Sequence, residues 1–297
     1  MDLARETSDT GRFVRQPNRF TTRIEEGGEH PPEAGRYRLY ASYACPWAHR
    51  SLIVRELLGL QEVVGVTIVD PIRDERGWRI PGGDPVSGAE FLSELYLATD
   101  PGFEGRYTVP CVWDAETGVL VTNDYPQITL TLETAFAPWH AEGAPDLYPA
   151  ALRAEIDALN DQIFHGLNNG VYRAGFATSQ EAYEEAVTDV FATLGTLEER
   201  LADRPYLHGD ALTESDVRLY PTLARFDAVY YSHFKCSVRR LTDHPALWAY
   251  ARRLYAIPAF RDTTDFDHIK RHYFVTQRNI NPTGIVPLGP EIDWTAP

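Results

Sequence analysis

The chain has 297 residues, 43% hydrophobic and 24% charged, a balance typical of globular proteins and a length that favours two domains. Lysine and arginine number 28 against 43 aspartate and glutamate residues, which gives a formal net charge of −15. Such an acidic surface repels phosphate backbones and anionic lipid headgroups, so we expect neither nucleic acid nor a membrane as a partner.

Cysteine use and the N-terminus indicate a compartment. No apolar run reaches the roughly 18 residues of a membrane span, and the polar stretch from Met1 to Glu26 lacks the apolar core of a signal peptide. Three cysteines in so long a chain do not make a disulfide framework. We therefore expect a reducing compartment, the cytoplasm.

The first elements in chain order predict a βαβ unit. Residues 1–34 are expected to form an irregular N-terminal arm that ends at glycines and prolines. Residues 37–41 alternate like a strand, and residues 49–60 carry the apolar face of a helix. The β-branched run at 63–69 is a second strand, which should be parallel to the first.

A long excursion over residues 70–106 separates this unit from the next pattern. The expected elements are a short helix at 90–98, strands at 108–113 and 119–122, and a helix at 128–135. The short connection between the two strands fits an antiparallel hairpin. The complete order, β-α-β and then β-β-α, predicts an α/β thioredoxin-like domain over residues 35–136.

Helical periodicity dominates from residue 148 onward and predicts an all-α domain over residues 148–297. Proline and glycine at 137–149 suit an interdomain linker. The expected helices cover residues 150–168, 179–202, 214–231 and 245–256. Thr213 and Asp216 have the spacing of a capping box, and the proline-rich chain after Thr276 is expected to be an extended tail.

Cys45 is the candidate nucleophile. It follows a predicted strand and precedes a predicted helix whose first turn contains Pro46. Free backbone N–H groups and the helix dipole favour a thiolate there, so its pKa should fall below the free value of roughly 8.5. His49 and Arg50, one turn further on, add positive charge.

The position that would hold a second thiol in a Cys-x-x-Cys motif is Ala48. The expected chemistry is therefore monothiol: Cys45 attacks a sulfur, forms a mixed disulfide with a small thiol, and is released by a second small thiol. A buried core cysteine is the alternative interpretation of Cys45. Cys111, in an apolar strand, and Cys236 lack the helix-start setting and are expected to be structural.

Val109-Pro110 is the second marker of a thiol site. Proline removes a hydrogen-bond donor where it enters a strand. A cis peptide bond would turn the backbone N–H and C=O of Val109 toward Cys45, where they can pair with an extended peptide-like thiol. A trans proline at the first residue of a strand is the alternative.

Five separated motifs resemble the glutathionyl-hydroquinone reductases, also called xi-class glutathione transferases, over about Gly35 to Pro290. They are Cys45-Pro-Trp-Ala48, Gly77-Trp78, Thr108-Val-Pro110, Asn168-Asn-Gly-Val-Tyr-Arg-Ala-Gly-Phe176 and Asn281-Pro-Thr-Gly-Ile-Val-Pro287. The resemblance implies the glutathione transferase fold, no tightly bound cofactor, and a thiol such as glutathione as co-substrate. We also expect a homodimer.

The resemblance implies roles for particular residues. Cys45 is the nucleophile that takes the thiol from a glutathionyl-hydroquinone, Trp78 packs on the thiol, and Val109 pairs with its backbone. Tyr172 and Tyr273 match the phenols over the hydroquinone, where an O–H group can hydrogen-bond the quinol oxygen and help to protonate the departing ring. Packing at a domain boundary is the alternative role for both tyrosines.

The sequence departs from the family at one point. A Glu-Ser pair commonly begins the helix after the hairpin and grips the γ-glutamyl group, whereas this chain has Asp124-Tyr125 followed by Pro126. Asp124 and Tyr125 remain the candidate thiol-binding residues, together with the amides of the helix start. Another small thiol, such as mycothiol or a different sugar thiol, is therefore an alternative to glutathione.

Two further functional hypotheses stay open, and metal binding is disfavoured. An omega-like transferase would deglutathionylate proteins or reduce dehydroascorbate without Tyr172 and Tyr273, and a non-catalytic thiol-binding protein would keep an ordinary thiol at Cys45. His268 and His272 have the spacing of two zinc ligands on a helix, but no clear third ligand accompanies them, so we expect no metal.

Overall fold

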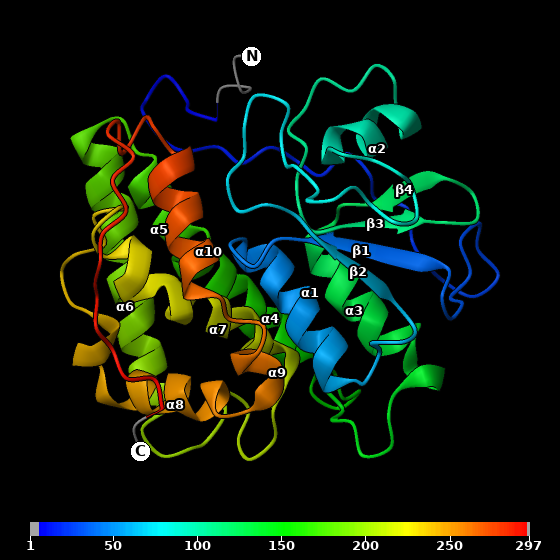
Figure 1. The fold of residues 1–297 in the computed structure, drawn as a ribbon. Helices are drawn as coiled ribbons and strands as arrows, with labels where there is room; N and C mark the ends of the chain where they lie inside the picture. Colours follow the sequence, from blue (N-terminus) through cyan, green and yellow to red (C-terminus); the bar gives the residue numbers. More distant parts are fainter. Residues whose placement is uncertain (1–5, 296–297) are drawn as a thin grey trace. The chain divides into compact units, whose positions relative to one another are not determined.

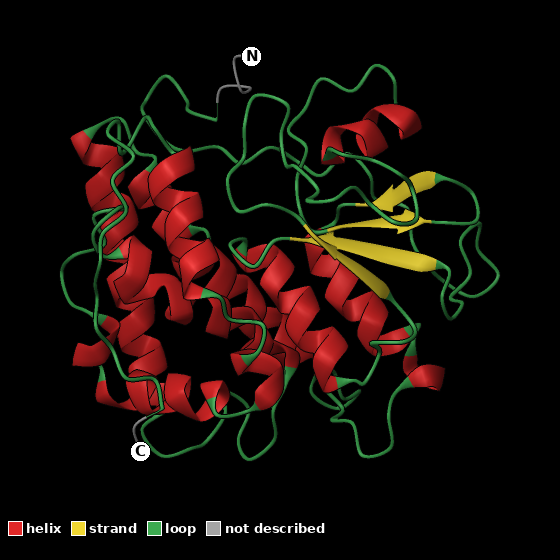
Figure 2. Cartoon of the chain, in the orientation of Figure 1, coloured by secondary structure: helices red, strands yellow, loops and turns green. Residues whose placement is uncertain are grey.

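The computed structural model describes residues 6–295, which divide into two compact units. Residues 17–145 form the first unit, and residues 6–16 together with 146–295 form the second. The expected fold class, a thioredoxin-like domain followed by an all-α domain, is confirmed (Figure 2). No helix in the described part of the chain is long and apolar enough to cross a membrane.

The first unit is built on a four-stranded sheet. Its elements are β1 (Tyr37–Ala41), α1 (Pro46–Leu57), β2 (Gly65–Ile68), α2 (Leu92–Thr99), β3 (Cys111–Asp114), β4 (Val119–Thr122), α3 (Tyr125–Thr134) and the 3₁₀ turn η1 (Ala137–Trp139). The strand order is β2-β1-β3-β4, with β1 parallel to β2 and antiparallel to β3. Helices α1 and α3 lie side by side on one face of the sheet, and α2 packs beside β4 (Figure 1).

The arm that precedes this sheet is tied to it. Thr21 pairs with Thr122 as an isolated antiparallel bridge, which continues the sheet beyond β4. The side chain of Phe20 packs on Tyr96 of α2, with ring centroids 5.4 Å apart. Residues 17–24 therefore cover the edge strand and reach the start of α3, which matters for the site below.

The second unit contains helices and a tail. Its elements are α4 (Arg153–Ile163), η2 (Phe164–Asn168), α5 (Gly170–Gly175), α6 (Gln180–Arg200), α7 (Glu214–Arg225), η3 (Phe226–Tyr230), η4 (Leu241–Asp243), α8 (Pro245–Tyr255), α9 (Pro258–Arg261), α10 (Phe266–Arg271) and η5 (His272–Thr276). The segments η2, η3 and η5 are π-helical. Residues 277–295 form a tail that runs along the helices of this unit (Figure 1).

Two of the expected helices are therefore divided. The predicted helices at 150–168 and 214–231 each change from α to π geometry, at Phe164 and at Phe226. The capping box is confirmed: the side chain of Asp216 accepts hydrogen bonds from the backbone N–H and the hydroxyl of Thr213, at 2.8 and 2.9 Å.

Candidate active site

Cys45 is the N-cap residue of α1, with Pro46 as the first helical residue. Its backbone is extended, with φ −81° and ψ 121°, so its side chain lies where the first N–H groups of the helix lack intrahelical partners. The thiol donates a hydrogen bond to the backbone C=O of Val109, with Sγ and O 3.2 Å apart. The Val109–Pro110 peptide bond is cis, as predicted. Two residues predicted for the thiol site are thus in contact.

The other two cysteines are buried. Burial raises the pKa of Cys111 far above its ordinary value, and it raises the pKa of Cys236 to about 12. Both therefore remain neutral thiols at physiological pH, which removes them as nucleophiles. Cys45 alone among the three is partly exposed.

Trp47 links the start of α1 to the start of α3. The guanidinium of Arg50, itself 2% exposed, lies 4.6 Å from the ring centroid of Trp47. Tyr125 packs on the same tryptophan, with ring centroids 4.7 Å apart. The aromatic ring of Tyr125 is therefore held by packing, and a cation stays next to the first turn of the helix that begins after Cys45.

Asp124 is the N-cap residue of α3, but its side chain makes no capping hydrogen bond. Instead one carboxylate oxygen accepts from the amide of Asn18 at 3.2 Å, and the other lies 3.7 Å from a guanidinium nitrogen of Arg23. Sequence reasoning missed these two arm residues. Nothing in the local sequence of Asn18 or Arg23 indicates a contact with a residue more than one hundred positions away.

Trp78 is 4% exposed within the excursion between β2 and α2. Its backbone C=O accepts a hydrogen bond from Leu92 N–H at 2.9 Å, which fixes the excursion to the start of α2. The guanidinium of Arg73 lies 5.7 Å from its ring centroid. The packing of Trp78 on a bound thiol stays a prediction.

Tyr172 and Tyr273 meet within the helical unit. Their phenolic oxygens are 2.5 Å apart, and a third phenol, Tyr230, lies 3.1 Å from the oxygen of Tyr273. All three are at most 9% exposed. Burial raises the pKa of Tyr230 and Tyr273 well above 10, so both remain protonated and keep their O–H groups at physiological pH.

Sequence reasoning also missed Tyr230, in addition to the arm residues Asn18 and Arg23. The predicted helix at 214–231 contained it, but a regular α-helix gave no reason to separate it from the other tyrosines. Tyr230 and Tyr273 both lie on π-helical segments, η3 and η5. Such segments often occur at functional sites, and their geometry is not visible in the sequence.

The histidines proposed as possible zinc ligands lie where α10 passes into η5. His268 is in α10, and His272 is the first residue of η5. Among residues 6–295, no three histidine, cysteine, aspartate or glutamate side chains are arranged to hold a metal ion.

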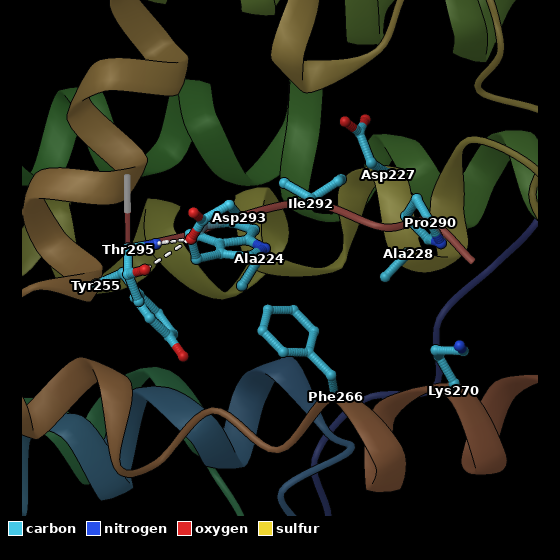
Figure 3. Close-up of a pocket in the computed structure, with 11 residues that line it drawn as sticks. Ala224, Asp227, Ala228, Tyr255, Phe266, Lys270, Pro290, Ile292, Asp293 and Thr295 are labelled. Atoms are coloured by element: carbon cyan, nitrogen blue, oxygen red, sulfur yellow. Dashed lines mark hydrogen bonds between the residues drawn. The ribbon is translucent and has the colours of Figure 1, made fainter. Parts of the chain in front are cut away.

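A cavity of about 330 Å³ lies beneath the tail, within the helical unit (Figure 3). The short side chains of Ala224 and Ala228 leave room on one wall, and Phe266 lies on the opposite side. Trp294 anchors the tail there, with its ring 5.5 Å from that of Phe266. The charged lining is one ammonium, Lys270, and two carboxylates, so its charge favours no single class of ligand.

A thioredoxin-like unit with a cysteine at a helix start, followed by an all-helical unit, defines a thiol transferase of the glutathione transferase fold. Comparison with known families agrees: residues 180–253 match the model of the glutathione S-transferase C-terminal domain. The glutathione transferase Xi of Phanerochaete chrysosporium superimposes with a TM-score of 0.91 at 46% identity, covering 94% of this chain and 97% of that one.

Closely similar sequences extend over nearly the whole chain. Glutathionyl-hydroquinone reductase YqjG of Escherichia coli is 45% identical, over 98% of this chain and 92% of the relative. The glutathione-bound structure of YqjG superimposes with a TM-score of 0.87 at 47% identity, covering 91% and 89% of the two chains. The chain belongs to the glutathionyl-hydroquinone reductases, the xi class of glutathione transferases, and is an enzyme of this kind.

Proposed function

We propose that this enzyme removes a low-molecular-weight thiol from thiol–hydroquinone conjugates by reduction. The carrying observation is Cys45 at the N-cap of α1 against the C=O of Val109, with Ala48 where a resolving thiol would stand. The Cys45 thiolate attacks the conjugate sulfur, and the bond between that sulfur and the ring carbon breaks. The ring carbon takes a proton, and the hydroquinone leaves.

A second thiol completes the reaction. Its thiolate attacks the ligand sulfur of the mixed disulfide, releases a symmetrical disulfide and restores Cys45. The ring is reduced by two electrons, and two small thiols are oxidised to the disulfide. Tyr172 and Tyr273, joined by Tyr230, hydrogen-bond the quinol oxygen and assist protonation of the ring; burial raises the pKa of Tyr273 well above 10, so its phenol keeps its proton.

The test follows Cys45 directly. Mixing the protein with a glutathione conjugate of menadiol should give one thiol adduct, on Cys45, by mass spectrometry. Cys45→Ser should lose several orders of magnitude in rate, since a hydroxyl is a poor nucleophile at neutral pH, whereas Cys236→Ala should retain activity. Iodoacetamide should label Cys45 with a midpoint below the roughly pH 8.5 of a free thiol. A midpoint at or above that value would favour the non-catalytic alternative.

Tyr172→Phe separates this function from the omega-like one. Hydroquinone release should slow by about 10²-fold if the phenol assists ring protonation. Reduction of dehydroascorbate or of a glutathionylated peptide uses no quinol oxygen and should be unchanged. Equal losses on all substrates would contradict the role of this phenol.

The thiol itself is the finer part of the proposal. Asp124 pairs with the arm and Tyr125 is held on Trp47, so neither reproduces a Glu-Ser pair. A site with altered polar partners discriminates strongly, because unmatched buried polar groups are costly. We expect weaker use of glutathione than of a sugar thiol such as mycothiol. Steady-state rates on the matching conjugates of one quinol decide this, and efficient reduction of the glutathione conjugate alone would contradict it.

The proposal also includes a homodimer and a cytoplasmic location. Three free cysteines suit a reducing compartment, the cytoplasm. A homodimer is expected from the resemblance to the family. Light scattering after size-exclusion chromatography tests the dimer, and a mass near the 33.5 kDa of one chain would contradict it.

A further inference from the structure

The chain that follows η5 folds back on the end of this π-helix, which carries Tyr273. A helix leaves its last four C=O groups without intrahelical partners. Of the carbonyl groups of residues 273–276, two accept backbone N–H groups from the next residues, at 3.3 and 3.0 Å. The other two, those of Phe274 and Val275, accept hydrogen bonds from side chains. The end of η5 is therefore closed by residues outside it.

Asn281 supplies the first of these side chains. Its amide nitrogen donates to the C=O of Phe274 at 2.7 Å and to the C=O of Ile285 at 3.0 Å. Its backbone N–H donates to the C=O of Gln277 at 3.0 Å. One amide group thus ties the residue after Tyr273 to the tail, with both of its N–H groups in use.

Arg278 supplies the second side chain that closes the end of η5. Its Nε donates to the C=O of Val275 at 2.8 Å, and its Nη1 donates to the C=O of Pro282 at 3.2 Å. Gly284 lets the chain pass beside this guanidinium: its φ is +68°, and a Cβ there would lie 2.3 Å from Nη1. The motif at 281–287 thus forms a closed loop against η5, to which its asparagine, proline and glycine all contribute.

The placement of the Tyr273 phenol depends on η5. Its hydrogen bonds to Tyr172 and Tyr230 measure 2.5 and 3.1 Å, and a shift of half an ångström would put the longer one outside good geometry. A π-helical turn is rarely stable by itself. We infer that Asn281, supported by Arg278, is a positioning residue for the Tyr273 phenol. Its effect on catalysis rests on the proposed function, whereas its effect on the position of the phenol does not.

Asn281→Asp tests the inference because it keeps the shape of the side chain and removes both N–H donors. Protein labelled with 3-fluorotyrosine gives ¹⁹F resonances, and the line that disappears in Tyr273→Phe belongs to Tyr273. We expect Asn281→Asp to shift that line. The matched control Asn279→Asp, an exposed asparagine two positions away, should leave it in place. An unchanged Tyr273 line in Asn281→Asp would overturn the inference, and Arg278→Gln gives the same test should Asn281→Asp fail to fold.

A double-mutant cycle connects the inference to catalysis. Asn281→Asp should lower kcat about tenfold with little change in KM, and should cost less than about twofold in the Tyr273→Phe background. Equal costs in both backgrounds would overturn the inference. A shifted ¹⁹F line with unchanged kcat would support the positioning of Tyr273 and contradict its role in the proposed function.

Discussion

Asp124 shows how the surroundings of one residue decide its chemistry. Aspartate at an N-cap position usually accepts hydrogen bonds from the N–H groups of its own helix. Here the carboxylate turns to the arm instead, toward Asn18 and Arg23. Arg23 brings a cation to the start of α3, where the backbone N–H groups of Tyr125 and Gln127 donate to the C=O groups of Asn123 and Asp124, both at 2.9 Å. The cation that a ligand carboxylate would meet at this place is the guanidinium of Arg23.

Restoring the family pair is the prediction at the scale of residues. Asp124→Glu combined with Tyr125→Ser should raise kcat/KM for the glutathione conjugate by about tenfold, since one well-placed polar contact is worth about 1–3 kcal/mol. The same double variant should lower kcat/KM for the sugar-thiol conjugate. Rates on both conjugates measure this exchange. If neither rate changes, residues other than these two read the thiol.

At the scale of elements, π-helical turns set the positions of the tyrosine side chains. Three helices of the second unit change their hydrogen-bond pattern at a π-helical segment, and two of these segments carry Tyr230 and Tyr273. Each extra residue in a turn rotates the side chains that follow it. The phenols of Tyr172, Tyr230 and Tyr273 converge as a result, although they come from three different helices.

The capping box of α7 allows a prediction about stability. Asp216 is fully buried and accepts from the Thr213 hydroxyl, from Leu207 N–H and from the Tyr250 hydroxyl, the last at 2.7 Å. Thr213→Ala removes one of these donors and should lower the free energy of unfolding by about 1–2 kcal/mol. Urea denaturation measures it, with Thr196→Ala, an exposed threonine of α6, as the control. Equal midpoints for both variants would contradict this account of the capping box.

Tyrosine burial is a property of the whole molecule. Six tyrosines are at most 1% exposed, and burial is the largest cause that raises the pKa of each: Tyr40, Tyr96, Tyr220, Tyr230, Tyr250 and Tyr273. The unfolded chain releases these protons near pH 10. Above that pH the folded state holds more protons than the unfolded state, so the stability due to burial is complete below about pH 10 and falls as the pH rises further.

The predicted consequence is steep alkaline unfolding. Each of the six tyrosines should cost about 1.4 kcal/mol of unfolding free energy per pH unit above about 10. Lysines add little to the titration in this range, because the chain has only two of them, Lys235 and Lys270. The urea midpoint should fall sharply between about pH 10 and 11, and Tyr220→Phe should reduce the slope. A midpoint that stays constant over this range would show that these phenols ionise without unfolding.

The sequence by itself determined the fold class and the place of Cys45. Alternation, helical periodicity and the capping box are local patterns, and they predicted the order of elements along the first unit, most helices and the start of α7. Cys45-Pro46 between a strand and a helix indicated an N-cap position, which the structure confirms. Proline after Val109 likewise predicted the cis bond correctly. These features depend on neighbours in sequence, so the sequence is sufficient.

Only the tertiary structure decided which distant residues complete these sites. Asn18 and Arg23 reach Asp124 because the arm pairs with β4, and Tyr230 joins Tyr172 and Tyr273 because π-helical turns rotate it. Side-chain contacts of this kind depend on where separate segments meet in space. Which segments come into contact is set by the packing of the whole unit, and no local pattern of residues predicts it.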